Sequence, residues 1–438
     1  MSAEWREVTV DDVKAESENS LATGPFGSSI GSRFFTNSGV PVIRGSNLSE
    51  DIGIRLNDQG LVFLSPDKAL QFSRSKVRDG DLVFTCWGTV NQVGLIDKRA
   101  AYPEYIISNK QMKLTPNPAK ADSLFLYYMF SSPELQERIK NESIGSSVPG
   151  FNLGQLRSMR IRIPELDEQH AIARVLGTLD DKIELNRKMN ETLEAMARAL
   201  FKSWFVDFDP VRAKAQGRDP GLPKHLADLF PNSFEECELG DIPKGWHISR
   251  LGEIASMQRG TLNPGAFPEE VFDHYSIPAY DEGREPKVET GEQIKSNKFL
   301  IPPGAVMISK LNPRFPRVWL PELSSIRRSV CSTEFIVLAP KSMSTIQYLY
   351  CLCISEWFFD TFATLVTGTS SSHQRVKPDD LLRMQVAVPS SNVVGKFSDL
   401  VAPLLRQVIK RAEGSRTLAA LRDALLPKLI SGEIRVKR

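Results

Sequence analysis

The sequence repeats itself across its two halves. GSSVPGFNLGQLRSMRIRIP, residues 145–164, resembles GTSSSHQRVKPDDLLRMQVAVP, residues 368–389, in the order of several residue types. Both stretches begin with glycine and hydroxyl residues, reach a leucine and a methionine, and end in an alternating apolar run closed by proline. The offset is 223 residues at the glycine and 225 from the leucine onward, about half of the 438 residues. Such an offset predicts two copies of one structural module.

The duplication extends beyond these stretches in both directions. Four further pairs of segments correspond in pattern: residues 4–8 with 245–249, 76–88 with 297–311, 105–117 with 329–340, and 122–139 with 344–362. The middle pairs read as strands bounded by turns, and the last pair reads as an apolar helix. Each half is therefore predicted to be a mixed strand-and-helix module of roughly 150 residues.

A heptad pattern follows the closing proline of each copy. Apolar positions recur in steps of four and three residues, which is typical of a coiled coil. They are Ile172, Leu176, Leu179, Ile183, Leu193 and Leu200 in the first copy, and Phe397, Val401, Leu404, Val408, Leu418 and Leu425 in the second. Polar residues interrupt both seams at matching places, Asn186 and Asn190 in one and Arg411 and Ser415 in the other.

Two interpretations of these helices remain. They could be surface helices on separate cores, or they could pack on each other. The shared register and the matched polar interruptions favour pairing, because polar seam residues fix register at a cost in stability. The segment between the first helix and the second module is rich in Pro, Gly and Asp, which predicts a linker and an antiparallel pair.

Composition excludes several classes of protein. The chain has 55 basic and 53 acidic residues, so any nucleic-acid surface must be a local patch. The five cysteines (Cys86, Cys237, Cys331, Cys351 and Cys353) form no CxxC motif, which indicates reduced thiols in a cytosolic protein. No apolar run reaches the length of a membrane span and the start does not read as a signal peptide, so we expect a soluble cytoplasmic protein without membrane contact.

Catalytic motifs are scarce. The sequence has no phosphate-binding loop, no metal-ligand spacing of histidines and no nucleophile elbow. Gly-rich residues 24–31 lack the dinucleotide-binding spacing and are predicted to form a loop. Asp281, Glu285 and Lys287 loosely resemble the carboxylates and lysine of a metal-dependent nuclease, but the first copy has no counterpart. We therefore expect neither a catalytic site nor a metal site in this chain.

Residues suited to DNA contacts gather in loops at corresponding places of the two copies. Arginine reads guanine, Asn and Gln read adenine, and hydroxyl groups hold phosphate. The candidates are Arg44, Ser46, Asn47, Thr85, Trp87, Asn91, Asn109, Gln111, Ser146 and Ser147 in the first copy, and Lys310, Asn312, Arg314, Arg317, Ser371, Ser372, His373, Gln374 and Arg375 in the second. Lys110, Arg327 and Arg328 lie in the same loops. Any one of them could be a solvated loop residue, and their concentration in both copies is the argument for binding.

On these features the chain resembles the specificity subunit of type I restriction–modification systems over essentially its whole length. Three segments carry the resemblance: residues 161–214, which open with IRIPELDEQHAIARVL, residues 238–260, and residues 421–436. The proline followed by Glu-Gln ahead of the first helix is specific to the family. The second copy lacks this Glu-Gln pair in VPSSNVVGKF, which weakens a partner contact assigned there.

The resemblance implies an α+β fold with two α/β target-recognition domains in a pseudo-twofold arrangement, separated by two long antiparallel coiled-coil helices. The implied boundaries are 1–164 for the first recognition domain, 165–208 for the first conserved helix, 209–244 for a linker, 245–389 for the second recognition domain, and 390–438 for the second conserved helix and C-terminal segment. Each domain would read one half of a bipartite, asymmetric site in double-stranded DNA.

The resemblance also implies partners. The helices would set the gap between the half-sites and dock two methylation subunits, and restriction subunits would complete the complex. S-adenosylmethionine, ATP and Mg would bind to those partners, so the chain itself is expected to hold no cofactor and to be a non-catalytic subunit of an endonuclease and adenine methyltransferase.

Two alternatives are kept open. One is a related protein with a fused nuclease or methylase, which the absence of catalytic motifs opposes. The other is a two-domain protein-binding scaffold without DNA recognition. Salt separates the second from a DNA-binding subunit, because phosphate contacts predict a steep loss of affinity as salt rises.

Overall fold

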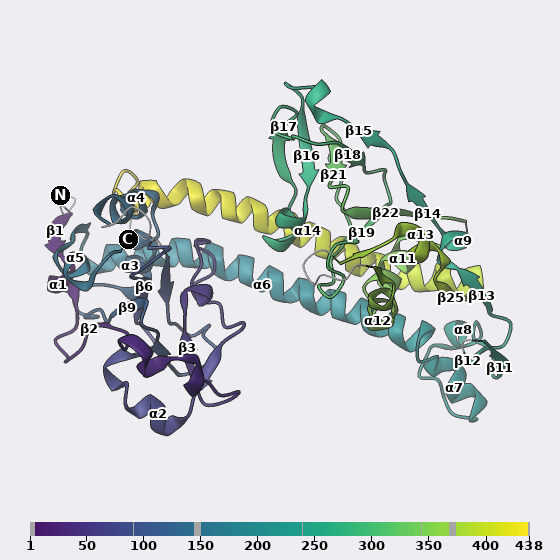
Figure 1. The fold of residues 1–438 in the computed structure, drawn as a ribbon, viewed down its shortest axis with the longest axis horizontal. Coiled ribbons are helices and arrows are strands. Elements are labelled where there is room, and N and C mark those ends of the chain that lie inside the picture. Colours follow the sequence, from purple (N-terminus) through teal and green to yellow (C-terminus); the bar gives the residue numbers. More distant parts are fainter. Residues whose placement is uncertain are drawn as a thin grey trace. The chain divides into compact units, whose positions relative to one another are not determined.

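The chain consists of two compact units joined by two long helices. The computed structural model describes residues 5–90, 92–143, 150–238, 240–342, 344–367 and 374–436. Unit 1 comprises Met1–Arg187 with Glu413–Arg438, and unit 2 comprises Lys188–Ala412. The helices α6 (Leu166–Phe205) and α14 (Ser391–Ile430) have 40 residues each, and each contributes to both units (Figure 1).

Unit 1 contains two four-stranded sheets. The first is antiparallel and consists, in order, of β2 (Leu21–Thr23), β9 (Gln111–Leu114), β6 (Leu82–Thr85) and β7 (Val93–Leu95). The second consists of β4 (Val62–Leu64), β3 (Val40–Ile43), β8 (Glu104–Ile107) and β5 (Lys76–Arg78), with β3 and β8 parallel. A separate antiparallel pair joins β1 (Arg6–Thr9) to β10 (Arg160–Ile163).

The core of unit 1 lies between the antiparallel sheet and helix α3. The shorter helices are α1 (Val10–Val13), α2 (Pro66–Leu70), α3 (Ser123–Phe130), α4 (Pro133–Glu142) and α5 (Leu153–Ser158). Helix α3 begins where the side chain of Asp122 accepts a hydrogen bond from the backbone of Phe125, and its last six residues are buried. Ile172 of α6 and Leu426 of α14 belong to the same buried cluster, so this module is built onto both helices.

Unit 2 contains the corresponding sheets. The antiparallel sheet consists, in order, of β14 (Ala255–Gln258), β22 (Phe335–Pro340), β19 (Val306–Ser309) and β20 (Val318–Trp319). The mixed sheet consists of β15 (Thr261–Leu262), β18 (Lys298–Leu300), β21 (Arg328–Cys331), β16 (Val271–Tyr275) and β17 (Lys287–Thr290), with β16 and β21 parallel. Two short pairs complete the unit: β13 (His247–Arg250) with β25 (Gln385–Val388), and β23 (Val366–Thr367) with β24 (Arg375–Val376).

The shorter helices of unit 2 are α9 (Leu251–Ile254), α10 (Ile277–Asp281), α11 (Ile346–Cys353), α12 (Glu356–Thr364) and α13 (Pro378–Arg383). All except α10 follow the order of unit 1; α10 lies between β16 and β17, whereas α2 follows β4. Short 3₁₀ turns complete both units: η1 (Gly27–Ile30), η2 (Ser32–Phe34), η3 (Gly45–Asn47), η4 (Ser73–Ser75) and η5 (Pro264–Ala266). The predicted loop at residues 24–31 thus contains the turn η1.

The two units share one topology. The sheet β2-β9-β6-β7 corresponds strand for strand to β14-β22-β19-β20, and the parallel pair β3–β8 corresponds to β16–β21. The helices α5 and α13, the strands β10 and β25, and the helices α6 and α14 are each related by an offset of 225 residues. The predicted duplication and the predicted α+β fold are confirmed.

The two long helices run antiparallel within each unit. In unit 1 the amide of Asn186 donates a hydrogen bond to the Ser415 hydroxyl over 3.2 Å. In unit 2 the amide of Asn190 donates to the backbone carbonyl of Val408 over 3.1 Å. Partner numbers fall along α14 as they rise along α6, which defines an antiparallel pair. Three of the four polar seam positions, Asn186, Asn190 and Ser415, therefore make hydrogen bonds between the helices.

The apolar seam is less uniform than the heptad pattern predicts. Ile172, Leu176, Phe397 and Val401 are buried, but Leu179, Ile183, Leu193, Leu200, Leu404, Val408, Leu418 and Leu425 are only half-buried. Asp180 and Arg422 are buried instead, at 1% and 5% exposure. The reason is that each helix packs against a module as well as against the other helix, which rotates the buried face away from a strict two-helix seam.

The predicted linker is folded. It contains α7 (Asp209–Ala215), α8 (Lys224–Ala227) and the hairpin of β11 (Phe234–Cys237) with β12 (Gly240–Pro243). Val211, Phe230 and Ile242 bury their side chains in the core of unit 2. The residue ranges of the five predicted domains and segments stay predictions.

The cysteines and the helices bear on the predictions of free thiols and of no membrane span. All five cysteines are free, and four of them are buried. Across the described ranges, no helix combines the length and apolar composition that a membrane span requires.

Candidate nucleic-acid interface

In unit 1, four chain segments meet at one edge of the antiparallel sheet. Because its strands alternate in direction, β2 and β6 end at the edge where β9 begins. The backbone amide of Gly24 donates to Gln111 over 2.9 Å, and that of Cys86 donates to Lys110 over 2.7 Å. The amide of Phe151 then donates to Cys86 over 2.8 Å. We call this side of the sheet, with its loops, the loop edge of unit 1.

In unit 2, the same segments meet at the equivalent edge, which we call the loop edge of unit 2. The amide of Lys310, just after β19, donates to the carbonyl of Glu334, just before β22, over 2.9 Å. The amide of Val376 donates to Lys310 over 3.1 Å, and that of Asn312 donates to Gln374 over 2.9 Å. The repeated backbone pattern shows that both copies build their loops in the same way.

Asn91, Ser146, Ser147, Ser371, Ser372 and His373 lie outside the described residues, so their predicted contacts stay predictions. The residues that follow each Gly-Ser stretch are described. Gly150 forms a β-bridge with Trp87, and Arg375 forms one with Leu311. Gly150 and Arg375 therefore lie beside the loops that follow β6 and β19, respectively.

Trp87, Asn109 and Lys110 are exposed on the loop edge of unit 1. The indole of Trp87 is 51% exposed and lies against the backbone of Gly150, where an added Cβ would come within 2.4 Å of the ring. Glycine at this position therefore allows the ring to lie flat on the backbone. An exposed aromatic face beside a lysine can contact sugar and base edges while the cation holds a phosphate.

Three of the predicted contacts in unit 1 are buried. Asn47 is fully buried, and its amide donates to the carbonyls of Asn57 and Gln59 over 2.9 and 3.1 Å and accepts from Arg44 over 3.0 Å. Thr85 and Gln111 are buried as well. These three side chains are closed off from solvent in this structure, and their DNA contacts stay predictions. The physical reason is that a turn between strands must satisfy its own backbone groups, and short amides do this well.

Two other candidates in unit 1 differ in how accessible their side chains are to DNA. Ser46 is exposed beside Asn47. The guanidinium of Arg44 is half-buried and donates to the carbonyl of Gly60 over 2.7 Å, so a base contact by Arg44 would have to replace that bond. Both remain predicted DNA contacts.

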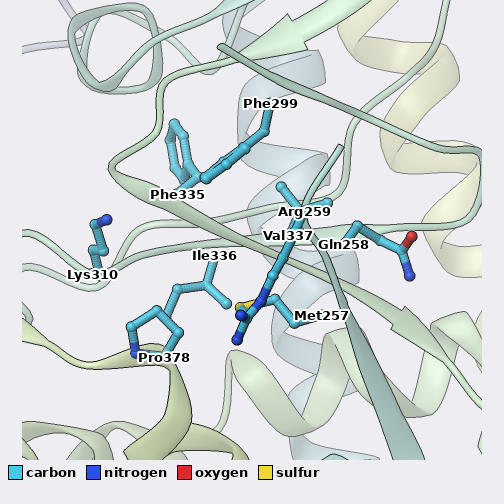
Figure 2. A pocket seen from close by; sticks show the side chains of 9 residues that line it. All are labelled: Met257, Gln258, Arg259, Phe299, Lys310, Phe335, Ile336, Val337 and Pro378. Carbon is cyan, nitrogen blue, oxygen red and sulfur yellow. The ribbon is translucent and has the colours of Figure 1, made fainter. Parts of the chain in front are cut away.

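The loop edge of unit 2 contains a pocket of about 140 Å³. Its walls come from the end of β14, from β18, from β22 and from the loop after β19; they are formed by Met257, Gln258, Arg259, Phe299, Lys310, Phe335, Ile336, Val337 and Pro378. Figure 2 shows the ammonium of Lys310 and the amide of Gln258 on opposite sides of the apolar lining. The arrangement suits an apolar or aromatic group of a ligand whose charged part binds at the rim.

Most arginines near this pocket are already paired. Arg317 makes a two-pronged ion pair with Asp281 at 2.7 and 2.8 Å, and Arg375 makes one with Glu334 at 3.0 and 3.1 Å. The hydrogen bonds that Arg317 donates to the Asp281 carboxylate raise the pKa of Arg317. In contrast, Lys310 and Arg314 have no ion-pair partner in the described part of the chain, so they are the cations available to phosphate or base edges.

Four further polar loop residues complete unit 2. Gln374 is half-buried next to Asn312, whose backbone adopts a left-handed φ of 49°. Such a conformation is uncommon for a residue other than glycine and fixes the shape of the loop. Arg327 and Arg328 pair with Asp273 and Glu270 respectively.

The nuclease-like triplet is used structurally. Asp281 pairs with Arg317, and Lys287 pairs with Glu282 over 2.9 Å. Within the described ranges, no group of three or more His, Cys, Asp or Glu side chains is placed to hold a metal ion. The acidic residues of this segment therefore shape a loop.

Sequence reasoning missed the pocket residues Gln258, Arg259, Phe299 and Phe335. Phe299 and Phe335 read as ordinary apolar strand residues, and they lie in two different sheets that meet at the pocket. One signal was present in the sequence. Gln258 and Arg259 directly precede Gly260, which matches Gly24 of the first copy. That match points to the same loop edge.

The comparisons with known proteins agree with this architecture. Residues 30–195 match the family model described as the type I restriction modification DNA specificity domain. The chain is 28% identical over 327 residues to the type I restriction enzyme MjaIX specificity subunit of Methanocaldococcus jannaschii, covering 72% of this chain and 70% of that protein. It is 25% identical over 381 residues to the HindI specificity subunit of Haemophilus influenzae, covering 75% and 81%. The crystal structure of a type I S subunit from M. genitalium shares the fold, with a TM-score of 0.56 at 17% identity over 98% of this chain and 96% of that one.

Proposed function

We propose how this chain, which belongs to the family of type I restriction–modification specificity subunits, reads DNA: each loop edge contacts one half of a bipartite site. The observation that carries the proposal is the repeated loop edge. The same sheet edge in both units gathers cations without ion-pair partners in the described residues, next to exposed or pocket-lining aromatic rings. In unit 1 these are Lys110 and Trp87, and in unit 2 they are Lys310, Arg314 and Phe335.

The two loop edges differ in chemistry, so we propose that the two half-sites differ in sequence. Unit 1 presents an indole that lies against the backbone of Gly150, whereas unit 2 presents a pocket lined by two phenylalanines. Equivalent positions hold unrelated residues: Gln111 begins β9 and Phe335 begins β22. Different groups at equivalent positions favour different base edges, which makes the complete site asymmetric.

The long helices are proposed to set the gap between the half-sites and to dock methylation subunits. Two large apolar side chains on them are exposed at matching positions, Met196 at 53% and Leu421 at 46%, related by the same offset of 225 residues. Matched exposed apolar residues on repeated helices suit two copies of one partner. Replacing either by aspartate should weaken capture of a methylation subunit with little effect on the stability of the chain.

The catalytic chemistry is proposed to belong to the partners. Two methylation subunits would bind S-adenosylmethionine, and restriction subunits would use ATP and Mg. This chain would supply sequence choice without a cofactor of its own and would act in the cytoplasm, where the cell's DNA is accessible to it.

The test is a pair of lysine variants in the complex with methylation subunits. Lys110→Ala and Lys310→Ala should each lower DNA affinity and reduce the slope of affinity against salt by about one, because each removes one phosphate contact. Lys224→Ala, an exposed lysine on α8 outside both loop edges, serves as the matched control. Equal salt slopes in all three variants and the parent would refute the interface, and salt-independent binding would favour the protein-binding scaffold.

A further inference from the structure

One arginine of each module reaches a carboxylate of helix α6. In unit 1 it is Arg55, in the connection between β3 and β4, residues 44–61. In unit 2 it is Arg284, in the connection between β16 and β17, residues 276–286. These connections are equivalent, because β3–β4 and β16–β17 are the matching antiparallel pairs of the two mixed sheets. Neither contact was predicted from the sequence.

In unit 1 the carboxylate is Asp180, which is 1% exposed. The hydroxyl of Tyr128 in α3 donates to Asp180 over 2.5 Å, and Arg55 donates to the same hydroxyl over 3.3 Å. Arg55 also pairs with Asp97 and lies 4.0 Å from Asp180. On the other side, the guanidinium of Arg422 in α14 donates to Asp180 over 2.9 Å. Asp180 therefore connects both long helices to the module.

The charges of this cluster are balanced despite their burial. Burial opposes the charge of Arg422, but hydrogen bonds with Asp423 and Asp180 raise its pKa above the usual value. Burial, followed by the charge of Asp180, raises the pKa of Tyr128, which therefore stays a neutral donor. A buried carboxylate needs such donors, because an unpaired charge in this position would be strongly unfavourable.

In unit 2 the carboxylate is Glu194, fourteen residues further along α6. Arg284 donates to it over 3.1 Å, and the hydroxyl of Tyr350 in α11 donates over 3.4 Å. Helices α3 and α11 are equivalent, so each unit combines an arginine of the same connection with a tyrosine of the same helix. The backbone of Arg284 adopts a left-handed φ of 59°, a conformation that surrounding contacts must hold in place for an arginine.

Each arginine also lies next to residues of the loop edge or its neighbouring turn. In unit 1, Asn47 closes the turn that contains Arg44. The side-chain amide of Asn47 donates to the backbone carbonyl of Asn57, and the backbone carbonyl of Asn47 accepts from the amide of Asn57. Asn57 is two residues from Arg55. In unit 2, the backbone of Arg284 donates to Tyr280, which adjoins Asp281. Asp281 in turn pairs with Arg317 in the loop that carries Arg314. A chain of contacts thus connects the carboxylates of α6 to residues that are proposed to face DNA.

We propose that Asp180 and Glu194 are positioning residues, through which α6 sets the position of the DNA-reading connection in each unit. The proposal rests on the proposed function. If these carboxylates only stabilised the fold, their loss would weaken binding to both half-sites. If they position the loops, their loss should affect only the half-site that one unit reads. The repetition of the contact on a single helix favours positioning, because α6 contributes to both units.

The experiment uses Glu194→Gln, because Glu194 is less buried than Asp180 and its loss should leave the fold intact. The complex with methylation subunits is offered duplexes with the parent's bipartite site, or with one half replaced. We expect Glu194→Gln to lose about fivefold or more of its discrimination at the unit 2 half-site, the lower end of a lost base contact. Discrimination at the other half-site and the Tm should stay at parent values.

Three comparisons make the result decisive. Asp360→Asn removes an exposed carboxylate of α12 in the same unit and should leave discrimination unchanged. The double variant Glu194→Gln with Arg284→Gln should be no worse than either single variant, because both remove one contact. Asp180→Asn should affect only the unit 1 half-site, and Asp180→Glu should restore part of it.

The outcomes separate the two proposals. If the parent complex shows no preference for any bipartite site, the proposed function fails. If the parent discriminates but Glu194→Gln stays within twofold of it at both half-sites, the positioning role is overturned. An equal loss at both half-sites also overturns it, because that result indicates a general structural role.

Discussion

At the scale of single residues, a polar side chain in a loop serves either the turn or the ligand, and its hydrogen bonds show which. Asn47 bonds three backbone groups and is closed off from solvent, whereas Ser46 beside it is exposed. Lys310 and Arg314 keep their charges available, whereas Arg317 and Arg375 are neutralised by carboxylates. The candidate interface is therefore smaller than the set of polar loop residues.

Replacing Asn47 tests this distinction. Asn47→Ala removes the amide that bonds the backbone carbonyls of Asn57 and Gln59 and should lower the free energy of unfolding by about 1–3 kcal/mol. Ser46→Ala should change it by less than about 0.5 kcal/mol, as is usual at an exposed site. Urea titration of the two variants measures both values. An Asn47→Ala protein as stable as the parent would mean that the amide does not hold the turn.

A half-buried histidine gives unit 2 a pH dependence. Burial lowers the pKa of His274 in β16, although the Glu289 carboxylate 2.5 Å away opposes the shift. Since the folded pKa lies below the unfolded value of about 6.5, the unfolded chain binds the proton first as pH falls. The free energy of unfolding should thus decrease from about pH 7 downward until the folded pKa is passed. In His274→Gln the decrease should be smaller, and an identical pH profile would contradict the assignment.

At the scale of elements, the repeat could be predicted and the sheet pairing could not. The offset of 225 residues between α6 and α14 follows from the printed sequence, since helix periodicity is a local property. The polar seam at Asn186 and Ser415 was likewise visible in the register. The strand order, the pocket and the cluster around Asp180 depend on contacts distant in sequence, for which a single chain carries no local signal.

Two leucines of α6 distinguish the packing in the structure from the ideal heptad. Leu176 is fully buried and Leu179 is half-buried, although both are seam positions in the sequence. Leu176→Ala should cost about 2–5 kcal/mol of unfolding free energy, and Leu179→Ala clearly less. In α14 the equivalent residues Val401 and Leu404 should differ in the same direction. A larger cost at Leu179 than at Leu176 would favour the ideal two-helix seam.

At the scale of the whole molecule, one helix pair serves two modules, and we propose that these modules read different sequences. If the helices set the gap, lengthening both should widen it while both half-sites keep their sequence. Four residues inserted after Arg187 and four after Ala412 add about 6 Å of helix, or about one to two base pairs. Four residues inserted in the exposed turn at residues 216–221, between α7 and α8, form the control and should leave the gap unchanged. An active helix variant with the parent's gap would show that the helices are not the spacer.

The central claim is that each unit reads one half of a bipartite site, and genome-wide methylation mapping tests it most directly. Cells that carry the complete methylase with the parent chain should show methylation at one bipartite motif, which disappears when the chain is removed. With Lys110→Ala the sequence preference should relax only in one half of the motif, and with Arg314→Ala only in the other. A motif that persists without the chain, or variants that relax both halves equally, would contradict the account.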